Sequence, residues 1–347
     1  MSFAPGPVRA AHRFDEAALE RYLASHVAGF AGPLSVQQFG GGQSNPTFLL
    51  TAGGRRYVLR KKPPGQLLKS AHQVDREYRI MKALAATDVP VPKMHALCED
   101  ESVIGTSFYV MDFLEGRIFR DPQLPGLAPA ERAAIYDSMN DVLARLHKVD
   151  FASVGLGDFG KPGNYFERQI ARWITQYRAA QTDDIADMER LIEWMPLNIP
   201  KDDSVSIAHG DYRLENTIFH PTEPKMIAVL DWELSTIGHP LADLAYNCMG
   251  YHVQNPRQGG LVGVDFAASG IPAERDYVAK YCARVGRGRI DNWSFYVSFA
   301  VFRLASIAQG VYKRGLDGNA SSETAATFCN TCQFLAGHAW RLANTRL

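Results

Sequence analysis

The side chains that could do chemistry are concentrated in one short stretch, residues 207–233. His209, Asp211 and Asn216 follow the spacing H-x-D-x-x-x-x-N, and Asp231 stands further along the same stretch. In phosphoryl transfer, the Asp of this pattern accepts the proton of the attacking hydroxyl and the Asn oxygen binds magnesium. A second carboxylate, here Asp231, is the kind of hard oxygen ligand that magnesium prefers. The stretch therefore predicts a catalytic loop with Asp211 as the base and Asn216 and Asp231 as metal ligands.

Two short runs with a strand-like pattern, at 217–220 and 226–230, lie between Asn216 and Asp231. A Pro-rich turn separates the two runs. This pattern predicts a β-hairpin. We therefore expect Asp211, Asn216 and Asp231 to meet at one end of a small sheet. Taken singly, these residues have ordinary explanations, since H-x-D is common and an Asp at a strand end often caps a turn. The complete series is what indicates a metal–phosphate site.

A glycine-rich turn, GGGQSNP at 40–46, joins two predicted strands near the N-terminus. Glycine allows backbone N–H groups to approach phosphate oxygens closely. We predict that Gly41, Gly42, Ser44 and Asn45 contact the phosphates of a nucleotide. The alternative is a hairpin turn that only needs positive φ angles. No Gly-Lys-Ser/Thr opens a helix here, so the turn is neither a P-loop nor a Rossmann motif.

The next predicted strand ends in a basic cluster, and the helix expected at 70–86 carries Glu77 near its middle. A kinase needs a strand cation, held by a helix glutamate, to bind the α- and β-phosphates. Arg60 paired with Glu77 would meet this need, with Lys61 as the alternative cation. Because a strand alternates its faces, Arg60 and Lys61 should point in opposite directions. A basic strand end exposed to solvent is the simpler explanation of any one of these residues.

A strand predicted at 107–111 runs into an extended piece, where we place a boundary between two domains. Residues 1–114 would form a nucleotide-binding lobe, and residues 115–347 a catalytic and substrate-binding lobe. Backbone groups of Met111, Asp112 and Leu114 would contact adenine at the hinge. The fold class expected is α+β, with a mainly antiparallel sheet first and helices after it. Those helices are expected at 129–149, 165–180, 184–195, 241–251, 273–285, 292–313 and 322–342.

The composition is that of an ordinary globular protein, with 46% apolar and 21% charged residues in a chain of 347. The net charge is zero, so we expect neither a nucleic-acid nor a membrane partner. The N-terminus has no apolar core of a signal peptide. The five cysteines are scattered, which indicates reduced thiols and a cytoplasmic location. Cys329 and Cys332 have redox-like spacing, but they lie in a predicted helix and we assign them to packing.

Several segments, read in this order, resemble the aminoglycoside phosphotransferase family, a branch of the protein-kinase-like fold. They are GGGQSN, YVLRKK, VDREYRIMKAL, VPVPK, YVMDFLEG, HGDYRLENTIF and VLDWELSTIGHPLADLAY. The resemblance covers nearly the whole chain from Leu34 onward. It implies ATP and Mg²⁺ as cofactors, a small-molecule substrate with a hydroxyl, and a brace for the catalytic loop at Asp243. Arg60 stands where the family most often has lysine, and Trp232-Glu233 follow Asp231.

Within that family, the run LDWELSTIGHPLADLAYNCMGY is most similar to the kinase-like domains associated with acyl-CoA dehydrogenases. This resemblance implies a hydroxyacyl-CoA as phosphoryl acceptor. An aminoglycoside or amino-alcohol kinase and a non-catalytic nucleotide-binding pseudokinase remain the alternatives. A protein kinase is disfavoured, because no Ala-Pro-Glu element follows Asp231.

The C-terminal part should provide the wall of the acceptor site, and it is rich in basic residues. Arg303 lies in the apolar helix SFYVSFAVFRLASIAQGVY, where an unpaired guanidinium would be costly to bury. It either contacts the substrate or pairs with a carboxylate of the catalytic region. Together with Trp293, Tyr296 and Phe299, a basic wall would suit an acyl substrate that carries phosphate or carboxylate. Apart from Arg303, most of these basic residues are expected to be solvated surface charges; the set is Arg257, Arg275, Lys280, Arg284, Arg287, Arg289, Arg303, Lys313 and Arg314.

Overall fold

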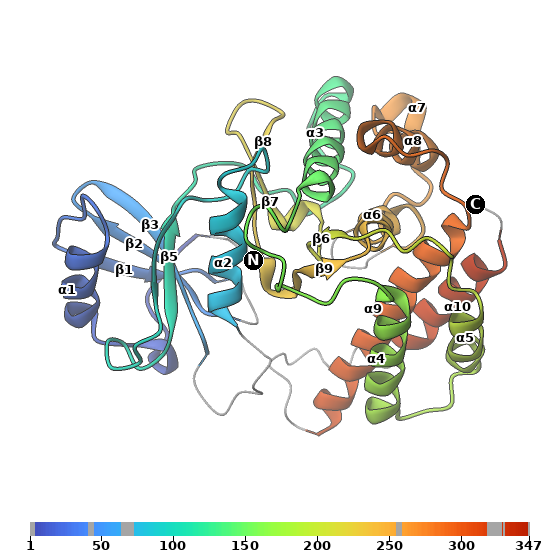
Figure 1. The fold of residues 1–347 in the computed structure, drawn as a ribbon, viewed down its shortest axis with the longest axis horizontal. Coiled ribbons are helices and arrows are strands. Elements are labelled where there is room, and N and C mark those ends of the chain that lie inside the picture. The colour runs from blue at the N-terminus through green and yellow to red at the C-terminus, as the bar shows by residue number, and fades with distance from the viewer. Residues whose placement is uncertain are drawn as a thin grey trace. The chain divides into compact units, whose positions relative to one another are not determined.

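The computed structural model of the chain divides into two compact units (Figure 1). The residues that the structure describes are 4–40, 45–63, 73–254, 259–317, 328 and 330–345. The first unit comprises Met1–Arg117, Ile218–Pro221 and Ile227–Leu234, and the second comprises the remainder. A single boundary after residue 114 was expected, whereas the first unit also takes in two pieces of the later hairpin. One reason is that the Val229 amide donates a hydrogen bond to the Pro90 carbonyl, 2.9 Å away.

The first unit is built on a five-stranded antiparallel sheet with the order β1-β2-β3-β5-β4. One face is covered by α1, where Leu19 and Leu23 join a buried cluster with Phe48 and Leu59. The other helix, α2, contacts β4 and β5. The strands are β1 (Ser35–Gln38), β2 (Thr47–Ala52), β3 (Arg55–Lys61), β4 (Met94–Cys98) and β5 (Phe108–Asp112); the helices are α1 (Glu16–His26) and α2 (Val74–Leu84).

The second unit is mainly helical, with a small sheet in which β6 pairs antiparallel with β9. Its helices are α3 (Pro129–Lys148), α4 (Tyr165–Ala180), α5 (Ala186–Leu197), α6 (Pro240–Cys248), α7 (Phe266–Ser269), α8 (Glu274–Val285), α9 (Trp293–Leu316) and α10 (Thr331–Ala343). Its short strands are β6 (Ser206–Ala208) and β9 (Thr236–Gly238). The predicted hairpin is present, formed by β7 (Thr217–Phe219) and β8 (Met226–Val229).

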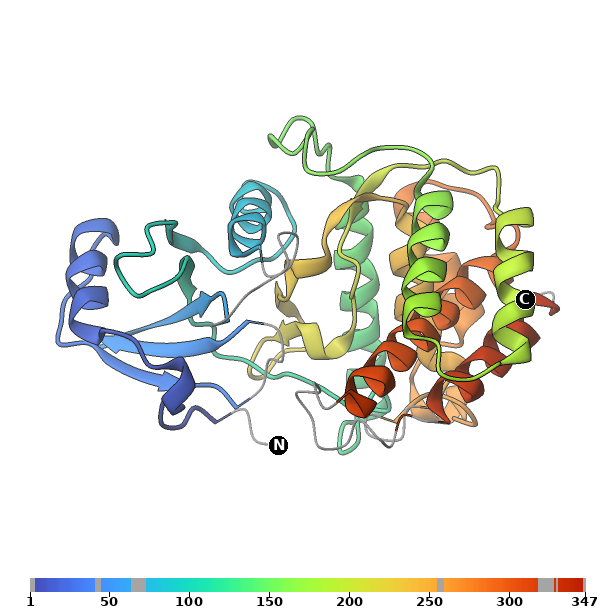
Figure 2. The same cartoon turned by 90° about the horizontal axis from the view of Figure 1, so that it is seen from below.

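Helix α9 is the central helix of the second unit and packs against α4, α6 and α10 (Figure 1, Figure 2). By length and composition alone it could cross a membrane, but 67% of its most apolar window is buried inside the structure. Such burial is typical of a core helix. The burial also explains why its sequence is apolar nearly all round rather than along one stripe.

Most predicted elements occur close to the expected places, and α4 has the predicted bounds. The strands β6 and β9 were not predicted, since each has three residues and too little pattern to recognise. The helix expected at 241–251 divides into α6 and a 3₁₀ turn, Met249–Tyr251. Of the helix expected at 322–342, α10 is the described part, and Cys329 lies outside the described residues. Cys332 is fully buried, as packing requires.

Candidate active site

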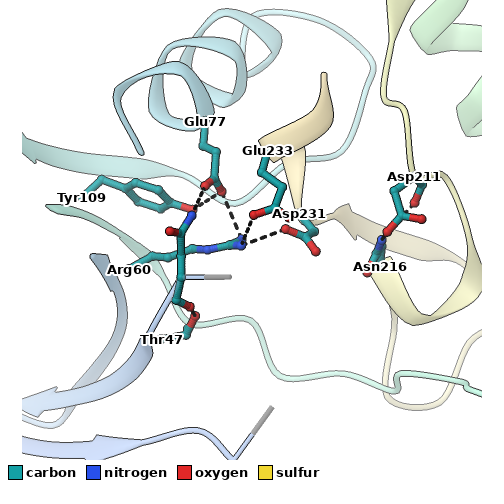
Figure 3. Close-up of polar contacts among 9 residues, drawn as sticks. Thr47, Arg60, Glu77, Tyr109, Asp211, Asn216, Asp231 and Glu233 are labelled. Atoms are coloured by element: carbon teal, nitrogen blue, oxygen red, sulfur yellow. Dashed lines mark hydrogen bonds and ion pairs between the residues drawn. The ribbon is translucent and has the colours of Figure 1, made fainter. Parts of the chain in front are cut away.

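Arg60 is the centre of a polar cluster in the first unit (Figure 3). Its guanidinium lies 3.0 Å from the Glu77 carboxylate and 2.8 Å from that of Asp231, with Glu233 at 3.5 Å. Arg60 reaches this position because β3 directs it to the face of the sheet on which α2 lies. The expected pair between a strand cation and a helix glutamate is therefore formed by Arg60 and Glu77.

Glu77 is held by three donors. Besides Arg60, the Asn45 amide nitrogen donates to one of its oxygens at 2.9 Å and the Tyr109 hydroxyl to the other at 3.0 Å. Burial, reinforced by the nearby carboxylates of Asp231 and Glu233, outweighs the effect of Arg60 and raises the pKa of Glu77 to about 7. For Arg60 the balance is opposite, because burial lowers its pKa but Glu77 and its other anionic neighbours raise it further.

Besides burial, both pKa values are affected by the sharing of one guanidinium among three carboxylates. Each carboxylate stabilises the cation, but the anions repel one another across the cluster. The most buried of them, Glu77, loses most water and so carries the largest penalty. The cluster has an excess of negative charge in which a bound cation would be stabilised.

Lys61 does not join this cluster. Its ammonium nitrogen lies 5.7 Å from the ring centroid of Phe14 and 5.9 Å from that of Phe48. This is the opposite face of β3, where burial lowers the pKa of Lys61. Of the two candidate cations, Arg60 alone forms the pair with Glu77. The reason is that side chains alternate between the two faces along β3, which could be predicted from the sequence.

The glycine-rich turn can be followed only at Gly40, Asn45 and Pro46, because residues 41–44, with the predicted Gly41, Gly42 and Ser44, lie outside the described residues. Asn45 is buried, and its side-chain amide is directed to Glu77. Its backbone carbonyl accepts a hydrogen bond from the Thr47 hydroxyl at 3.1 Å. The Asn45 side chain thus orients Glu77, and a contact of this turn with phosphate stays a prediction.

The predicted hinge begins inside the sheet. Met111 and Asp112 belong to β5, and the Asp112 amide donates to the Lys93 carbonyl at 2.9 Å. The Asp112 carboxylate lies 2.6 Å from Nε2 of His95. Leu114 follows the strand in an irregular segment and is half-buried. Adenine contact by this backbone remains a prediction.

In the second unit, Asp243 holds the loop that carries Asp211. Its carboxylate accepts the backbone N–H groups of His209 at 2.5 Å and Gly210 at 2.8 Å. Although burial raises the pKa of Asp243, hydrogen bonding and charge from His147, with the backbone donors, keep it below its usual value. Gly210 has φ +84°, a left-handed conformation that favours glycine. The expected brace at Asp243 is confirmed.

Asp211 is oriented by its neighbours on the same loop (Figure 3). The Asn216 amide nitrogen donates to the Asp211 carboxylate at 2.7 Å and to its backbone carbonyl at 2.9 Å. The Asp211 amide donates to Nδ1 of His209 at 3.1 Å, so that ring nitrogen is the unprotonated one. Arg213, which the sequence analysis did not single out, lies 3.3 Å from the carboxylate. The carboxylate is therefore a fixed acceptor of the kind that a general base requires.

Tyr246 is a second neighbour of Asp211 that sequence reasoning missed. Burial, together with the Asp211 carboxylate to which its hydroxyl is hydrogen-bonded, raises the pKa of Tyr246. The hydroxyl therefore stays protonated and available as a donor. Tyr246 is three residues after Asp243 on α6, a spacing that places both on one helix face. This spacing was the signal available in the sequence.

The predicted metal ligands have suitable chemistry. Because the Asn216 amide nitrogen bonds Asp211, its amide oxygen is directed away from that residue. Asp231 is a partly exposed carboxylate with φ +63°, a conformation uncommon outside glycine. No group of three His, Cys, Asp or Glu side chains in the described ranges could hold a metal by itself. Magnesium uses few protein ligands and completes its shell with phosphate and water. That Asp231 meets Asp211 and Asn216 stays a prediction.

Arg303 lies between two aromatic rings rather than against a carboxylate. Its guanidinium carbon is 5.1 Å from the ring centroid of Tyr246 and 5.5 Å from that of Trp173. Its Nε is buried without a hydrogen-bond partner, and the described part of the chain shows no ion pair for this residue. The pairing with a carboxylate that we considered is therefore not observed, and Arg303 is held by cation–π contacts beside the base.

Of the basic and aromatic residues expected in the acceptor wall, Arg287, Arg289 and Tyr296 line one cavity of the second unit, to which no described residue of the catalytic loop contributes. Trp293, Tyr296 and Phe299 are buried, and the latter two pack against Phe166 in the core. These three aromatic residues recur at helical spacing along α9, and they are buried because α9 is surrounded on most sides. Several basic residues pair with acidic ones, some within four residues and others far away in sequence, where no local pattern shows the partner. The observed pairs are Arg275–Asp276, Lys280–Asp137, Arg284–Asp137, Arg287–Asp202 and Lys313–Asp317. Arg257 lies outside the described residues.

A cavity of about 710 Å³ lies in the second unit and is lined mainly by apolar side chains. Arg213, Leu214 and Glu215 of the catalytic loop form part of its wall, together with Tyr246. The rest of the wall comes from α3, α9, α10 and the segment after α6. The base is thus bordered by residues that also line an apolar cavity.

A model of the phosphotransferase enzyme family matches residues 35–281. The chain belongs to this family. A solved structure described as a putative aminoglycoside phosphotransferase from Ralstonia eutropha is 52% identical, with a TM-score of 0.89 and coverage of 96% of this chain and 99% of that one. The aminoglycoside phosphotransferase solved with ADP and hygromycin B is 14% identical, covers 95% of this chain and all of its own, and has a TM-score of 0.62. The likeness shows the kinase-like fold.

Among curated proteins, mouse acyl-CoA dehydrogenase family member 10 is 49% identical over 97% of this phosphotransferase, and human family member 11 is 47% identical over 94%. The chain spans 32% of the length of the first and 42% of the second. The resemblance to kinase-like domains associated with acyl-CoA dehydrogenases is therefore shown. The relatives have further sequence to which this chain does not align.

Proposed function

We propose that this phosphotransferase moves the γ-phosphoryl group of ATP to a hydroxyl of a small molecule. The observation that carries the proposal is the geometry of Asp211, whose carboxylate is oriented by Asn216 on a loop braced by Asp243. Asp211 would accept the proton of the acceptor hydroxyl as that oxygen attacks the γ-phosphorus, while the bond from this phosphorus to the β–γ bridging oxygen breaks and ADP leaves. Arg60, held by Glu77, would bind the phosphate oxygens of the nucleotide.

Magnesium, held by Asn216 and Asp231, would neutralise charge on the phosphates. Arg60 as the phosphate cation differs from a lysine, because its planar guanidinium can donate two parallel hydrogen bonds to one phosphate. In the structure these donors are directed to carboxylates, Asp231 among them. Binding of a magnesium ion at Asp231 would weaken that pair, which would leave the guanidinium for the phosphates.

For the acceptor, we propose a hydroxyacyl-CoA. Support comes from the names of the curated relatives, which are acyl-CoA dehydrogenase family members, and from the apolar cavity beside the base. A polycationic aminoglycoside would need several carboxylates to pair its ammonium groups. Among the described residues that line the cavity there is one carboxylate, that of Glu215, which is 3.0 Å from Arg213.

A direct assay tests the proposal. Purified protein with Mg-ATP is offered hydroxyacyl-CoAs and, in parallel, kanamycin, and phosphorylated product and ADP are both measured. We expect transfer to the thioesters that is lost in Asp211→Asn and kept in the control Asp183→Asn, whose side chain is exposed between α4 and α5. Absence of transfer to every alcohol tested would reject the activity. Faster transfer to kanamycin would reject only the acceptor.

We also propose that the protein works in a reducing compartment such as the cytoplasm. The four described cysteines, Cys98, Cys248, Cys282 and Cys332, are all buried free thiols. Thiols of this kind persist where disulfides do not form. Localisation of the tagged full-length protein in its native cell would test this point.

A further inference from the structure

The cavity beside the catalytic loop has a wall with an unusual composition for a polar active site. From α9 and α10 it receives six apolar side chains: Leu304, Ile307, Ala308, Val311, Phe334 and Leu335. Two of them are large and yet exposed, Ile307 by 36% and Phe334 by 50%. Contiguous apolar surface that folding leaves accessible marks a binding site more often than a defect.

The polar residues of the wall gather where the catalytic loop contributes. Glu215 lies 3.0 Å from Arg213, and Arg120 approaches it at 3.9 Å. The same loop presents Asp211, and Tyr246 both lines the cavity and bonds that carboxylate. A ligand that places its hydroxyl at Asp211 therefore has charged groups beside its reactive end and hydrocarbon surface beyond them.

We infer that this cavity binds the hydrocarbon chain of the phosphoryl acceptor and selects acceptors by chain length. The inference rests on the proposed function and specifies how its site chooses a substrate. The volume of about 710 Å³ is in the usual range for pockets that enclose a small ligand. Since the one carboxylate among the described lining residues is already paired, the cavity suits an uncharged alkyl chain and not a polyamine.

Chain length should then appear directly in the kinetics. Each methylene that moves from water into the cavity should improve kcat/KM by about fourfold, until the wall is covered. The series hydroxybutyryl-, hydroxyhexanoyl-, hydroxyoctanoyl- and hydroxydecanoyl-CoA measures this slope. Ile307→Ser should flatten it. Ile307→Trp, which fills space, should move the optimum to shorter chains while transfer to hydroxybutyryl-CoA continues.

A control residue on the same helix separates the cavity from general effects on α9. Leu316 is 57% exposed and does not line the cavity, so Leu316→Ser should leave the chain-length slope unchanged. Calorimetry measures the affinity of the protein for decanoate and for butyrate, and this measurement does not depend on phosphoryl transfer. We expect decanoate to bind more tightly by roughly two orders of magnitude or more, and Ile307→Ser to remove most of this difference.

These measurements distinguish the two proposals. If no acceptor is phosphorylated but decanoate binds in an Ile307-dependent way, the proposed activity fails and the cavity assignment stands. If transfer occurs with equal kcat/KM along the series, or with a slope that Ile307→Ser and Leu316→Ser change alike, the cavity assignment is overturned and the activity stands. Tight binding of decanoate that is unchanged in Ile307→Ser also overturns the cavity assignment.

Discussion

Glu77 offers a test of the electrostatics of the Arg60 cluster, because its burial makes it sensitive to pH. Its pKa is raised from the ordinary 4.5 to about 7 by burial and by the carboxylates of Asp231 and Glu233. The folded protein therefore binds a proton at Glu77 more tightly than the unfolded chain does. The stability that this proton provides is complete below pH 4.5 and is lost as the pH rises through about 7.

The size of this effect follows from the shift. A pKa raised from 4.5 to about 7 corresponds to about 3 kcal/mol in the free energy of unfolding over the whole titration. About 2 kcal/mol of it falls between about pH 5.5 and about pH 8.5. Glu77→Gln removes the titration while its amide can still meet Asn45 or Tyr109. Arg60 keeps its contact with Asp231 at 2.8 Å, which limits the constant cost of the substitution.

We expect the free energy of unfolding of Glu77→Gln to increase relative to that of the wild type as the pH rises. The free energy of unfolding of the wild type, minus that of Glu77→Gln, should decrease by about 2 kcal/mol over that range, whatever its starting value. Urea unfolding at several pH values measures it. Glu115→Gln is the matched control, because Glu115 is 75% exposed and pairs with Arg56. A difference that stays constant, or that changes in the opposite sense, would show that pairing with Arg60 outweighs burial.

Three further substitutions test the assigned roles. Asp211→Asn should lower kcat by about 10²–10⁴-fold with nucleotide binding unchanged, as loss of a general base requires; near-normal turnover would contradict it. Asp231→Ala should weaken binding of Mg-ATP, measured by calorimetry, and an undiminished affinity would exclude Asp231 as a ligand. Arg303→Met keeps a long side chain but loses the cation between Tyr246 and Trp173. We expect a lower kcat/KM for the acceptor and an unchanged KM for ATP. Unchanged acceptor kinetics would show that Arg303 has a purely structural role.

The parts of the site that the sequence predicts are those fixed by local geometry. Asp211 and Asn216 are joined by hydrogen bonds within one loop, so their spacing is itself the structural information. Arg60 and Glu77 are also predictable, because strand alternation and helix position restrict which side chains can meet. Helix bounds such as those of α4 follow from apolar periodicity for the same reason.

The contacts of the site that could not be predicted from the sequence are those between residues far apart in the chain. Arg287 seemed available to a substrate, but Asp202 pairs with it from a separate segment. Tyr296 and Phe299 seemed to form a binding wall, but α4 brings Phe166 against both. Spacing within α9 cannot distinguish a helix that lines a cleft from one that is surrounded, since both show apolar residues at helical intervals.

The same distinction explains why the acceptor is harder to predict than the reaction. The loop between β6 and β7 contains the proposed base and one predicted metal ligand within a short segment, and Asp243 braces it from α6. In our proposal the acceptor is selected by the sum of weak apolar contacts from α3, α9 and α10, none of which belongs to that loop. The catalytic loop alone therefore does not determine the acceptor. A change at Ile307 should accordingly alter which acceptor is used, and leave intact the hydrogen bonds by which Asp211 is oriented.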